Sequence, residues 1–406
     1  MVERLNISKT AEQGIIQHIL SSDQQRITFA EYMEMALYHP QFGYYSTRDR
    51  TLGAQGDFVT SPHMGRDFGE LIAAQFVDMW KALGRPQPFN IVEIGAGQGL
   101  IAADVIAYLH THHPDCFTGL SYTIIEKSAQ LRAEQQARLS TWADQGVSLS
   151  WTTIAALPNH ALTGCIFSNE LVDALPVHWV EQHDQQLQEM WVVAAEQRIA
   201  PQLGALSTPE LATYFDKVHI DLRTGYPEGY RTEVNLAALD WLEQVAQKIE
   251  RGYLLTIDYG YTAQRYYSPA RKAGTLQCYY RHSHHNDPFI HIGEQDITAH
   301  VDFTALENQG HAVGLETIGF TQQALFLMAL GLGDRLSALS QPAFQHAAEQ
   351  PATTQTIRAI MQRREILQQL ISPMGLGGFG VLIQAKGLSQ KEIARPLKGL
   401  TIPAMF

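Results

Sequence analysis

The sequence predicts an α/β protein whose core is a parallel sheet with helices on both faces. From Phe89 onward, short apolar runs alternate with longer stretches of helical periodicity, which is typical of such a sheet. A glycine-rich loop, residues 95–99, directly follows the first apolar run. Polar and acidic residues at 168–173 follow a later run, at the strand end where open α/β sheets hold their ligands.

Length and charge limit the classes of function. A chain of 406 residues corresponds to two or three units of roughly 150 residues, or to one large core with insertions. Its 45% of hydrophobic residues indicates a globular protein rather than a disordered one. The 29 basic and 41 acidic residues give a net charge of −12 without a basic block, so nucleic acid is not expected as a partner.

The cysteines and the apolar runs indicate the compartment. Cys116, Cys165 and Cys278 are far apart in sequence and offer neither a disulfide framework nor a cysteine zinc site, which suits a reducing environment. The first ten residues contain no continuous apolar run of the kind a secretory signal needs. The longest apolar run, Ala324–Gly333, is half of a membrane span, so we expect a cytoplasmic protein without membrane insertion.

The first 85 residues read as a helical extension. Apolar spacing predicts helices over Gln25–Tyr38 and Asp67–Leu83, separated by a polar glycine-containing loop at Gly53–Ser61. With Tyr44 and Tyr45 this loop would form a lid over a ligand in which Phe58 excludes water. Phe58 as an ordinary packing residue is an equally good interpretation.

The alternating pattern gives the remaining elements. Strands are predicted at Phe89–Ile94, Ser121–Ile125, Val147–Thr153, Cys165–Ser168, Tyr253–Ile257, Val313–Ile318 and Phe379–Ala385. Helices are predicted at Leu100–His112, Lys127–Thr141, Leu236–Ile249, Gln322–Leu330 and Thr354–Leu370. An inserted hairpin joins Val177–Glu181 to Gln188–Ala195.

These elements suggest six regions along the chain. They are the helical extension with its covering loop (1–85), a ligand-binding core (86–176 and 232–262), the inserted hairpin region (177–231), a polar histidine-containing loop on the substrate side (263–312), C-terminal strands and helices that complete the core (313–388), and a tail (389–406).

The glycine loop favours S-adenosylmethionine as the ligand. Its spacing is G-x-G-x-G, at Gly95, Gly97 and Gly99, and Leu100 stands where a dinucleotide loop requires a further glycine. Glycines let a ligand approach the main chain without meeting a Cβ atom. Glu93, two residues before the first glycine, suits the positive ammonium of S-adenosylmethionine better than a pyrophosphate. The alternative is a strand–helix turn that is merely tight.

Carboxylates follow two further strands. Glu126 ends the second strand, where it would accept hydrogen bonds from ribose hydroxyls, although alone it could be a solvated helix-start residue. Asn169, Glu170 and Asp173 follow the fourth strand and would face the methyl end of the bound cofactor. A helix-capping role is reasonable for one of these three residues but strained for all of them.

The motifs together resemble the MidA-like family of class I S-adenosylmethionine-dependent methyltransferases. That family includes a mitochondrial factor that dimethylates an arginine of a respiratory complex I subunit. The segments that carry the resemblance cover roughly Ile27 to Ala385. They are YMEMALYHPQFGYYS (Tyr32–Ser46), GDFVTSPHMGRDFGELIA (Gly56–Ala73), VEIGAGQG (Val92–Gly99), SNELVDALPV (Ser168–Val177), TEVN (Thr232–Asn235), TIDYGY (Thr256–Tyr261) and the block Gly274–Leu306.

The resemblance implies a Rossmann-like sheet of seven strands, the last of them antiparallel, with a helical N-terminal extension. It implies that the cofactor contacts Thr60 and Ser61 besides Glu93, the three loop glycines, Glu126 and Asn169. It also implies a protein partner that presents an arginine. We leave open whether the chain forms a homodimer.

Arginine as the acceptor requires groups that grip a guanidinium. Carboxylates can hold two N–H groups in fork geometry and leave the third nitrogen free. Glu170, Asp173 and Glu233 are the candidates, and Asp258, after the fifth strand, is a weaker fourth. The clustered histidines show no metal-ligand spacing, so no metal is expected. His282 or His300 could assist deprotonation.

Two other functions stay open from sequence. One is an assembly factor that binds the cofactor without using it. The other is a nucleotide-dependent oxidoreductase, against which Leu100 in the glycine loop counts.

Overall fold

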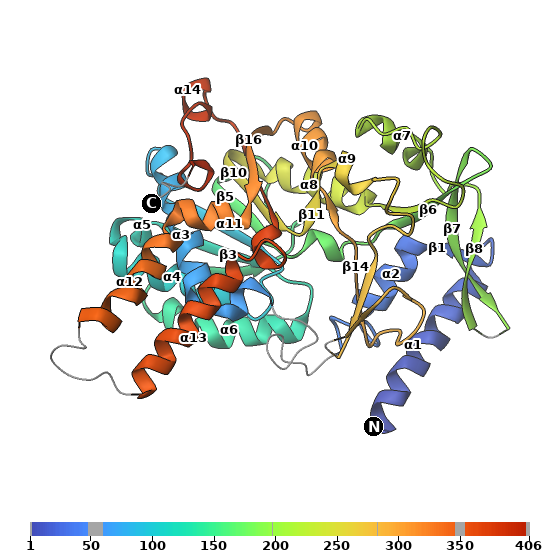
Figure 1. The fold of residues 1–406 in the computed structure, drawn as a ribbon, viewed down its shortest axis with the longest axis horizontal. Helices are drawn as coiled ribbons and strands as arrows, with labels where there is room; N and C mark the ends of the chain where they lie inside the picture. Colours follow the sequence, from blue (N-terminus) through green and yellow to red (C-terminus); the bar gives the residue numbers. More distant parts are fainter. Residues whose placement is uncertain (1, 48–59, 197, 282, 346–353, 403–406) are drawn as a thin grey trace.

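The computed structural model describes residues 2–47, 60–196, 198–281, 283–345 and 354–402 (Figure 1). Most of the predicted lid, including Phe58, therefore lies outside the described residues, as does His282. In the part of the chain that is described, no helix has both the length and the apolar character to span a bilayer. The three cysteines are buried free thiols.

The core is a seven-stranded sheet in the order β16-β17-β10-β5-β2-β3-β4. The neighbouring strands from β10 to β4 pair in parallel, whereas β17 is antiparallel to both of its neighbours, β10 and β16. This confirms the predicted parallel sheet, its seven strands and its antiparallel last strand. The strands are β2 (Phe89–Ile94), β3 (Leu120–Ile125), β4 (Ser148–Thr152), β5 (Leu162–Asn169), β10 (Ile249–Asp258), β16 (Glu316–Gln322) and β17 (Gly380–Lys386).

Helices cover both faces of this sheet because alternate residues of its central strands are apolar on both sides. In β5, Phe167 packs into one apolar cluster and Ile166 into another. The first cluster includes α3 (Arg66–Ala82), α4 (Leu100–His112), α6 (Ala129–Asp144) and α11 (Gln323–Leu330). The second includes α8 (Leu236–Lys248) and α10 (Phe303–Ala312). A buried strand of a parallel sheet reads as a continuous apolar run for this reason.

A second sheet lies beside the core, in the right half of Figure 1. Its order is β1-β7-β6-β9, with β8 also paired to β7. The predicted hairpin is present as β6 and β7, which pair antiparallel with Val180 opposite Glu189. The strands are β1 (Arg26–Thr28), β6 (His178–His183), β7 (Gln186–Ala195), β8 (Arg198–Gly204) and β9 (Arg231–Val234).

The N-terminal helices pack on this second sheet, and one predicted boundary is wrong. α1 (Val2–Ser21) precedes β1, and α2 begins at Phe29 and ends at Tyr38, not from Gln25 as predicted. Arg26–Thr28 instead pairs with Trp191–Val193 of β7. The Thr28 side chain and Glu31 then form a capping box that begins the helix.

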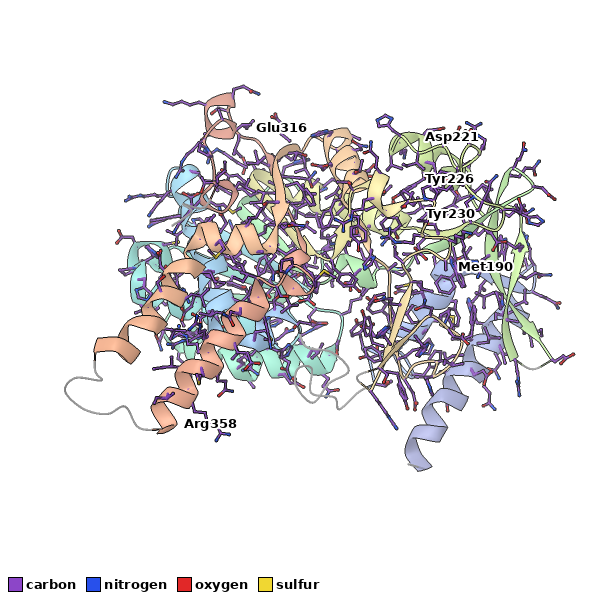
Figure 2. All side chains as sticks on the ribbon, in the orientation of Figure 1. Met190, Asp221, Tyr226, Tyr230, Glu316 and Arg358 are labelled. Carbon is purple, nitrogen blue, oxygen red and sulfur yellow. The ribbon has the colours of Figure 1, made fainter. Side chains whose placement is uncertain are left out.

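The inserted region also contains α7 (Pro209–Lys217) and an aromatic cluster above the second sheet. Tyr226 and Tyr230 pack edge to face with ring centroids 4.7 Å apart, and Figure 2 shows them together above Met190 of β7. This cluster gives the inserted region an apolar core of its own, which includes Tyr214 and Phe215 of α7.

Short elements complete the fold. The segment 263–312, predicted as a loop, forms α9, a three-stranded sheet of β13, β12 and β14, the helix α10, and β15, which pairs with β11 just before the segment. Their bounds are β11 (Gly260–Tyr261), α9 (Ala263–Tyr266), β12 (Gln277–Tyr280), β13 (Ser283–His285), β14 (Asp296–Thr298) and β15 (Val301–Asp302). The remaining short helices are α5 (Pro114–Thr118), α14 (Gln390–Ile393), and the 3-10 turns η1 (Ser61–Met64), η2 (Val172–Ala174), η4 (Leu376–Gly378) and η5 (Lys398–Leu400).

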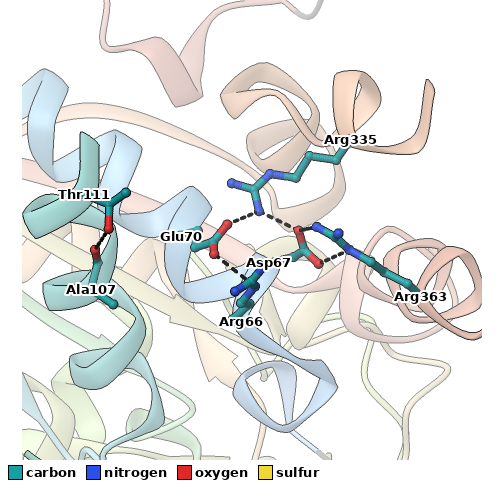
Figure 3. A network of polar contacts seen from close by, with 7 residues as sticks. All are labelled: Arg66, Asp67, Glu70, Ala107, Thr111, Arg335 and Arg363. Atoms are coloured by element: carbon teal, nitrogen blue, oxygen red, sulfur yellow. Dashed lines mark hydrogen bonds and ion pairs between the residues drawn. The ribbon is translucent and has the colours of Figure 1, made fainter. Parts of the chain in front are cut away.

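Ion pairs connect two helices near the C-terminus, α12 (Leu332–Gln345) and α13 (Thr354–Leu370), to α3. Asp67 of α3 accepts hydrogen bonds from Arg335 of α12 at 2.5 Å and from Arg363 of α13 at 2.7 and 2.9 Å. Figure 3 shows Glu70 completing this network through Arg335 and Arg66. The helix α13 was predicted with these bounds, whereas α12 was not predicted.

Candidate functional site

A cleft opens at the carboxyl ends of β2, β3 and β5, where the sequence places its polar residues. It encloses about 1080 Å³, including space open to solvent. Predicted residues that line it are Thr60, Glu93, Gly95, Gly97, Glu126, Asn169, Glu170 and Asp173. Gly99 and Ser61 do not line it. Tyr38, Tyr45, His63 and Lys127 are lining residues beyond those that the sequence singled out as cofactor contacts.

The glycine loop adopts backbone angles that side chains disfavour. Gly95, Gly97 and Gly99 have φ values of 73°, 52° and 73°. A Cβ atom on Gly95 would lie 2.8 Å from Leu171 Cδ1. Gly99 does not face the cleft and instead provides the left-handed residue from which α4 begins. The loop therefore leaves main chain exposed to the cleft at Gly95 and Gly97.

Gln135, which the sequence analysis did not single out, joins this loop to Glu126. Its side chain is fully buried, and Nε2 donates to Gly97 O at 2.7 Å and to Glu126 Oε2 at 3.2 Å. Its Oε1 accepts a hydrogen bond from Trp151 Nε1 at 3.0 Å. The second carboxylate oxygen of Glu126 accepts from the Ser128 backbone N–H at 2.9 Å. Gln135 thus fixes both the loop and the carboxylate.

Glu93 lies at the base of the cleft and is buried. Its Oε2 accepts a hydrogen bond from the Tyr122 hydroxyl at 2.6 Å. Burial raises the pKa of Glu93 to about 8, and the hydrogen bond from Tyr122 opposes this only in part. In the absence of a cationic neighbour, Glu93 is therefore largely protonated at neutral pH.

The turn after β5 places Glu170 in an unusual backbone conformation. Its φ is +53°, a left-handed value that is uncommon for a residue with a side chain. Its carboxylate oxygen Oε1 accepts from the Ser61 N–H at 3.2 Å and from Asn169 Nδ2 at 3.1 Å. Its own N–H donates to Ile257 O at 2.9 Å. These contacts offset the strain and aim the carboxylate at the cleft.

Asp258 stabilises the turn that follows β5 and carries Glu170 and Asp173 (the acidic turn). Its Oδ2 accepts the backbone N–H groups of Leu171 at 3.1 Å and Val172 at 2.9 Å. Asp258 is fully buried and lines neither the cleft nor the neighbouring cavity. It therefore positions the acidic turn, and nothing in its geometry gives it direct access to an acceptor.

A second cavity meets the cleft at Glu170 and Asp173, which line both. Its wall carries aromatic rings, one further carboxylate and an exposed arginine. These lining residues include Tyr259, Tyr261, Tyr279, Asp296, His300, Arg265, Phe320 and Phe379. The oxygens Asp173 Oδ1 and Asn169 Oδ1 are buried and have no hydrogen-bond partner among the described residues. Both oxygens can therefore accept a hydrogen bond from a ligand or from water.

The carboxyl groups at this junction do not ionise independently. Burial and then the nearby Asp173 charge raise the pKa of Glu170 to about 8. Burial raises the pKa of Asp173 to about 6, although a hydrogen bond from Tyr259 opposes the rise. Burial, followed by the charges of Asp173 and Glu170, also raises the pKa of Asp258. The group as a whole therefore favours a cation at the junction.

Glu233, a predicted member of the acceptor grip, lies elsewhere. It lines neither cavity. Its Oε2 accepts from the Thr275 N–H at 2.8 Å and from the Tyr266 hydroxyl at 3.2 Å, and its Oε1 accepts from the Leu276 N–H at 3.2 Å. These contacts hold the segment that leads into β12. Like Asp258, Glu233 is placed to position other residues.

His300 lies in the wall of the second cavity. Its ring packs edge-on between Tyr259 and Tyr261, with centroid distances of 5.1 and 5.0 Å. Burial lowers its pKa to about 4, so the imidazole is neutral at pH 7. A group with so low a pKa holds a proton weakly, which disfavours a role as a general base near neutrality.

Among the described residues, one group of side chains has metal-ligand proximity. It consists of His183, Asp184 and Glu228, at the turn of the β6–β7 hairpin and outside both cavities. Two of the three are exposed, and exposed acidic groups of this kind are common without an ion.

Comparison with known proteins shows which proteins this chain is similar to. A family model for S-adenosyl-L-methionine-dependent methyltransferases matches residues 71–321. The chain is 29% identical over 342 residues to the mitochondrial protein arginine methyltransferase NDUFAF7 homolog of Drosophila melanogaster, covering 77% of this chain and 73% of the relative. It is 28% identical over 334 residues to human NDUFAF7, a mitochondrial protein arginine methyltransferase, covering 77% and 72%.

Solved structures give the same result over nearly the whole chain. A COG1565 superfamily member from Burkholderia thailandensis, crystallised with S-adenosyl-homocysteine, matches with a TM-score of 0.82 and 29% identity over 97% of both chains. A native crystal structure of a COG1565 protein from the same organism matches with a TM-score of 0.80 and 30% identity, covering 98% of this chain and 96% of the other.

Proposed function

The chain belongs to the family of S-adenosyl-L-methionine-dependent methyltransferases, and from this premise we propose that it methylates an arginine side chain of a protein partner. Its cofactor is S-adenosyl-L-methionine. The observation that carries the proposal is the pair Glu170 and Asp173, which faces the cofactor cleft on one side and a second cavity on the other.

The residues present in the cleft fit the cofactor. Gly95 and Gly97 line the cleft and carry no side chain that would fill it, which suits a nucleoside beside the loop. Glu126, held by Gln135 and Ser128, would accept the ribose hydroxyls. Glu93 would hold the ammonium group, and Thr60 and Asn169 line the same wall. Ser61 and Gly99 would support this site from outside the cleft.

The acceptor arginine would enter through the second cavity and bind at the acidic junction, the place where Glu170 and Asp173 line both cavities. Glu170 and Asp173 can each accept N–H groups of a guanidinium, and the rings of Tyr259 and Tyr279 in the cavity wall favour a cation. Neighbouring carboxyls that have raised pKa values ionise readily when a cation binds beside them. Glu233 and Asp258 would contribute by holding the β12 segment and the acidic turn.

Bound S-adenosyl-L-methionine supplies an electrophilic methyl group: a guanidinium nitrogen forms the new N–C bond while the S–C bond breaks and its electron pair stays on sulfur. The nitrogen that is alkylated must lose a proton. Asp173, with an unpartnered buried oxygen and a pKa raised to about 6, is placed to accept it and to pass it to solvent through the second cavity.

The relatives support a protein acceptor. The Drosophila and human relatives are named protein arginine methyltransferases. By this likeness and the resemblance noted from the sequence, we propose a subunit of a respiratory complex I type as the partner. An arginine on such a subunit would enter the second cavity, whose carboxylates complement its charge.

The test is transfer of labelled methyl groups to an undermethylated extract from cells that lack the enzyme, with mass spectrometry to find the modified residue. We expect methylated arginine. Glu170→Gln should keep binding of S-adenosyl-homocysteine but slow transfer by roughly a hundredfold or more. Glu181→Gln, a buried glutamate paired with Arg231 on the second sheet, is the matched control and should leave transfer unchanged. Label on another residue type, or none in any extract, would refute the proposed acceptor.

A further inference from the structure

Gln323, the first residue of α11, joins three segments that meet behind Glu170. It is fully buried and lines neither cavity. Its side-chain Nε2 donates to Ser61 Oγ at 3.2 Å and to Leu370 O at 3.3 Å. Its backbone N–H donates to Phe379 O at 2.8 Å. One residue thus connects η1, the end of α13 and the segment that precedes β17.

Ser61 transmits this contact to the acidic junction. Its hydroxyl faces Gln323, and its backbone N–H donates to Glu170 Oε1 at 3.2 Å. That oxygen also accepts a hydrogen bond from the Asn169 side chain. Ser61 is fully buried and does not line the cleft, so it supports Glu170 from behind.

The other two contacts of Gln323 reach the second cavity. Phe379 lines that cavity together with Leu376 of η4 and Gly380 of β17. Leu370 ends α13, directly before the segment of Pro373 and Met374 that forms another part of the same wall. Gln323 therefore connects Ser61, which holds Glu170, with the backbone segments that form the wall of the second cavity.

We propose that Gln323 is a positioning residue for methyl transfer, which holds Ser61 so that its N–H fixes the Glu170 carboxylate at the junction of the two cavities. The inference rests on the proposed function for the role of Glu170. It adds a residue that touches neither cofactor nor acceptor. Misplacement of a reacting group by about 1 Å costs on the order of a hundredfold in rate, so a remote contact of this kind matters.

The experiment compares four variants. Gln323→Met removes the amide at nearly equal volume, Ser61→Ala removes the hydroxyl but keeps the N–H, and the double variant combines them. Gln384→Met is the control, because Gln384 of β17 is also fully buried and donates to a backbone carbonyl, that of Leu306. Calorimetry gives the affinities for S-adenosyl-L-methionine and S-adenosyl-homocysteine, and rapid quench gives the single-turnover rate.

The affinity ratio of the two ligands reports on Glu170, because only one of them carries a positive sulfonium. Gln323→Met and Ser61→Ala should each lower the preference for the charged ligand roughly three- to tenfold and slow transfer roughly ten- to a hundredfold. The double variant should be no worse than either single one, as expected of residues that act in series. Gln384→Met should lower thermal stability and leave both readouts within about twofold.

Failure of this inference differs from failure of the proposed function. If Gln323→Met changes only thermal stability, as the control does, or if the two single effects add, then Gln323 is a packing residue and the inference is wrong. If the ratio shifts as expected and Glu170→Gln abolishes the shift, but no arginine is methylated, then the positioning role is supported and the acceptor must be another cation.

Discussion

At the scale of single residues, the proton on Glu170 links the cofactor to the acceptor. In the protein alone, burial and the neighbouring Asp173 raise the pKa of Glu170 to about 8, so the carboxyl is mostly neutral at pH 7. A cationic ligand beside it favours the ionised form. Binding of a positive sulfonium must therefore expel a proton, whereas binding of the neutral thioether need not.

This predicts different proton release for the two forms of the cofactor. At pH 7, S-adenosyl-L-methionine should release up to about one proton more than S-adenosyl-homocysteine does. Calorimetry in buffers that differ in ionisation enthalpy measures the difference. Glu170→Gln should abolish it while both ligands still bind. Equal proton release by the two ligands in the unmutated protein would contradict the placement of Glu170 beside the sulfur.

Gln135 offers a second test at this scale. Gln135→Met removes the donor to Gly97 O and Glu126 and leaves buried oxygens unpaired. Cofactor affinity should fall by about 1–2 kcal/mol, which is roughly five- to thirtyfold. Gln75→Met is the control, because Gln75 is equally buried but accepts from the Gly399 N–H, away from the cleft. Both variants should lose stability, and only the first should lose affinity in titration calorimetry.

These residues mark how far the sequence can predict the site. Glu126, Asn169, Glu170 and Asp173 stand at strand ends, so their placement follows from the strand pattern alone. Gln135 lies within a helix and Gln323 begins one, and each holds a group that is distant in sequence, 38 residues away for Gly97 and 262 for Ser61, which only the folded chain brings close.

The acidic residues that the sequence grouped together separate in the structure for a related reason. Glu233 lies within β9 and Asp258 ends β10, but backbone N–H groups donate to both carboxylates, and neither side chain lines a cavity. Residue type and spacing cannot distinguish a carboxylate that faces a ligand from one that caps a turn.

At the scale of elements, strand prediction succeeded where both faces of a strand are apolar, as in β2, whose bounds match the prediction. It failed where the partner decides the structure. The three residues of β1 form a strand because β7 pairs with them, and their sequence reads equally well as the first turn of a helix. In α12 the apolar run ends before the helix does, and the contacts of Arg335 with α3 hold it.

The charged network between α3 and α13 predicts a stability effect of Asp67. Burial alone would raise the pKa of Asp67, but hydrogen bonds from Arg363 and Arg335 outweigh it and hold the pKa below its usual value. Asp67→Asn should lower the free energy of unfolding by about 1.5–3 kcal/mol at pH 7. Urea unfolding measures this loss.

The pH dependence checks its cause. A carboxyl with a lowered pKa in the folded state stabilises above its unfolded pKa and loses this contribution as pH falls through the folded value. The difference between the two proteins should therefore shrink below about pH 4. Asp78→Asn is the control on the same helix, since the Asp78 side chain is more exposed than that of Asp67 and pairs with Arg395 alone rather than with two arginines, and it should cost less than about 1 kcal/mol.

At the scale of the whole molecule, buried carboxyls set the pH range in which the fold is most stable. Burial raises the pKa of Glu93 and of Glu170 to about 8, and the pKa values of Asp104 and Asp302 to about 6. A group whose pKa is raised on folding stabilises fully below its unfolded pKa, and the contribution is lost as pH rises through the folded value. Here that window runs from about pH 4 to about pH 8.

The chain without ligand should consequently lose stability as the pH rises through neutrality. Between pH 6 and pH 8 the folded state retains protons on Glu93 and Glu170 that the unfolded state has released. Two such protons correspond to a slope of about −2.7 kcal/mol per pH unit, which other groups will reduce. The free energy of unfolding from urea titrations at pH 6, 7 and 8 gives the slope directly.

Glu93→Gln separates the two contributions. The amide keeps an oxygen acceptor for Tyr122 and cannot ionise, so this variant should lose about half of the slope and be the more stable protein, relative to the unmutated chain, at pH 8. Saturation with S-adenosyl-L-methionine should flatten the slope further, because the ligand stabilises the ionised junction that burial opposes. A free energy of unfolding that rises from pH 6 to pH 8 without ligand would mean that these carboxyls are ionised in the folded chain. The raised pKa values of Glu93 and Glu170 would then be wrong.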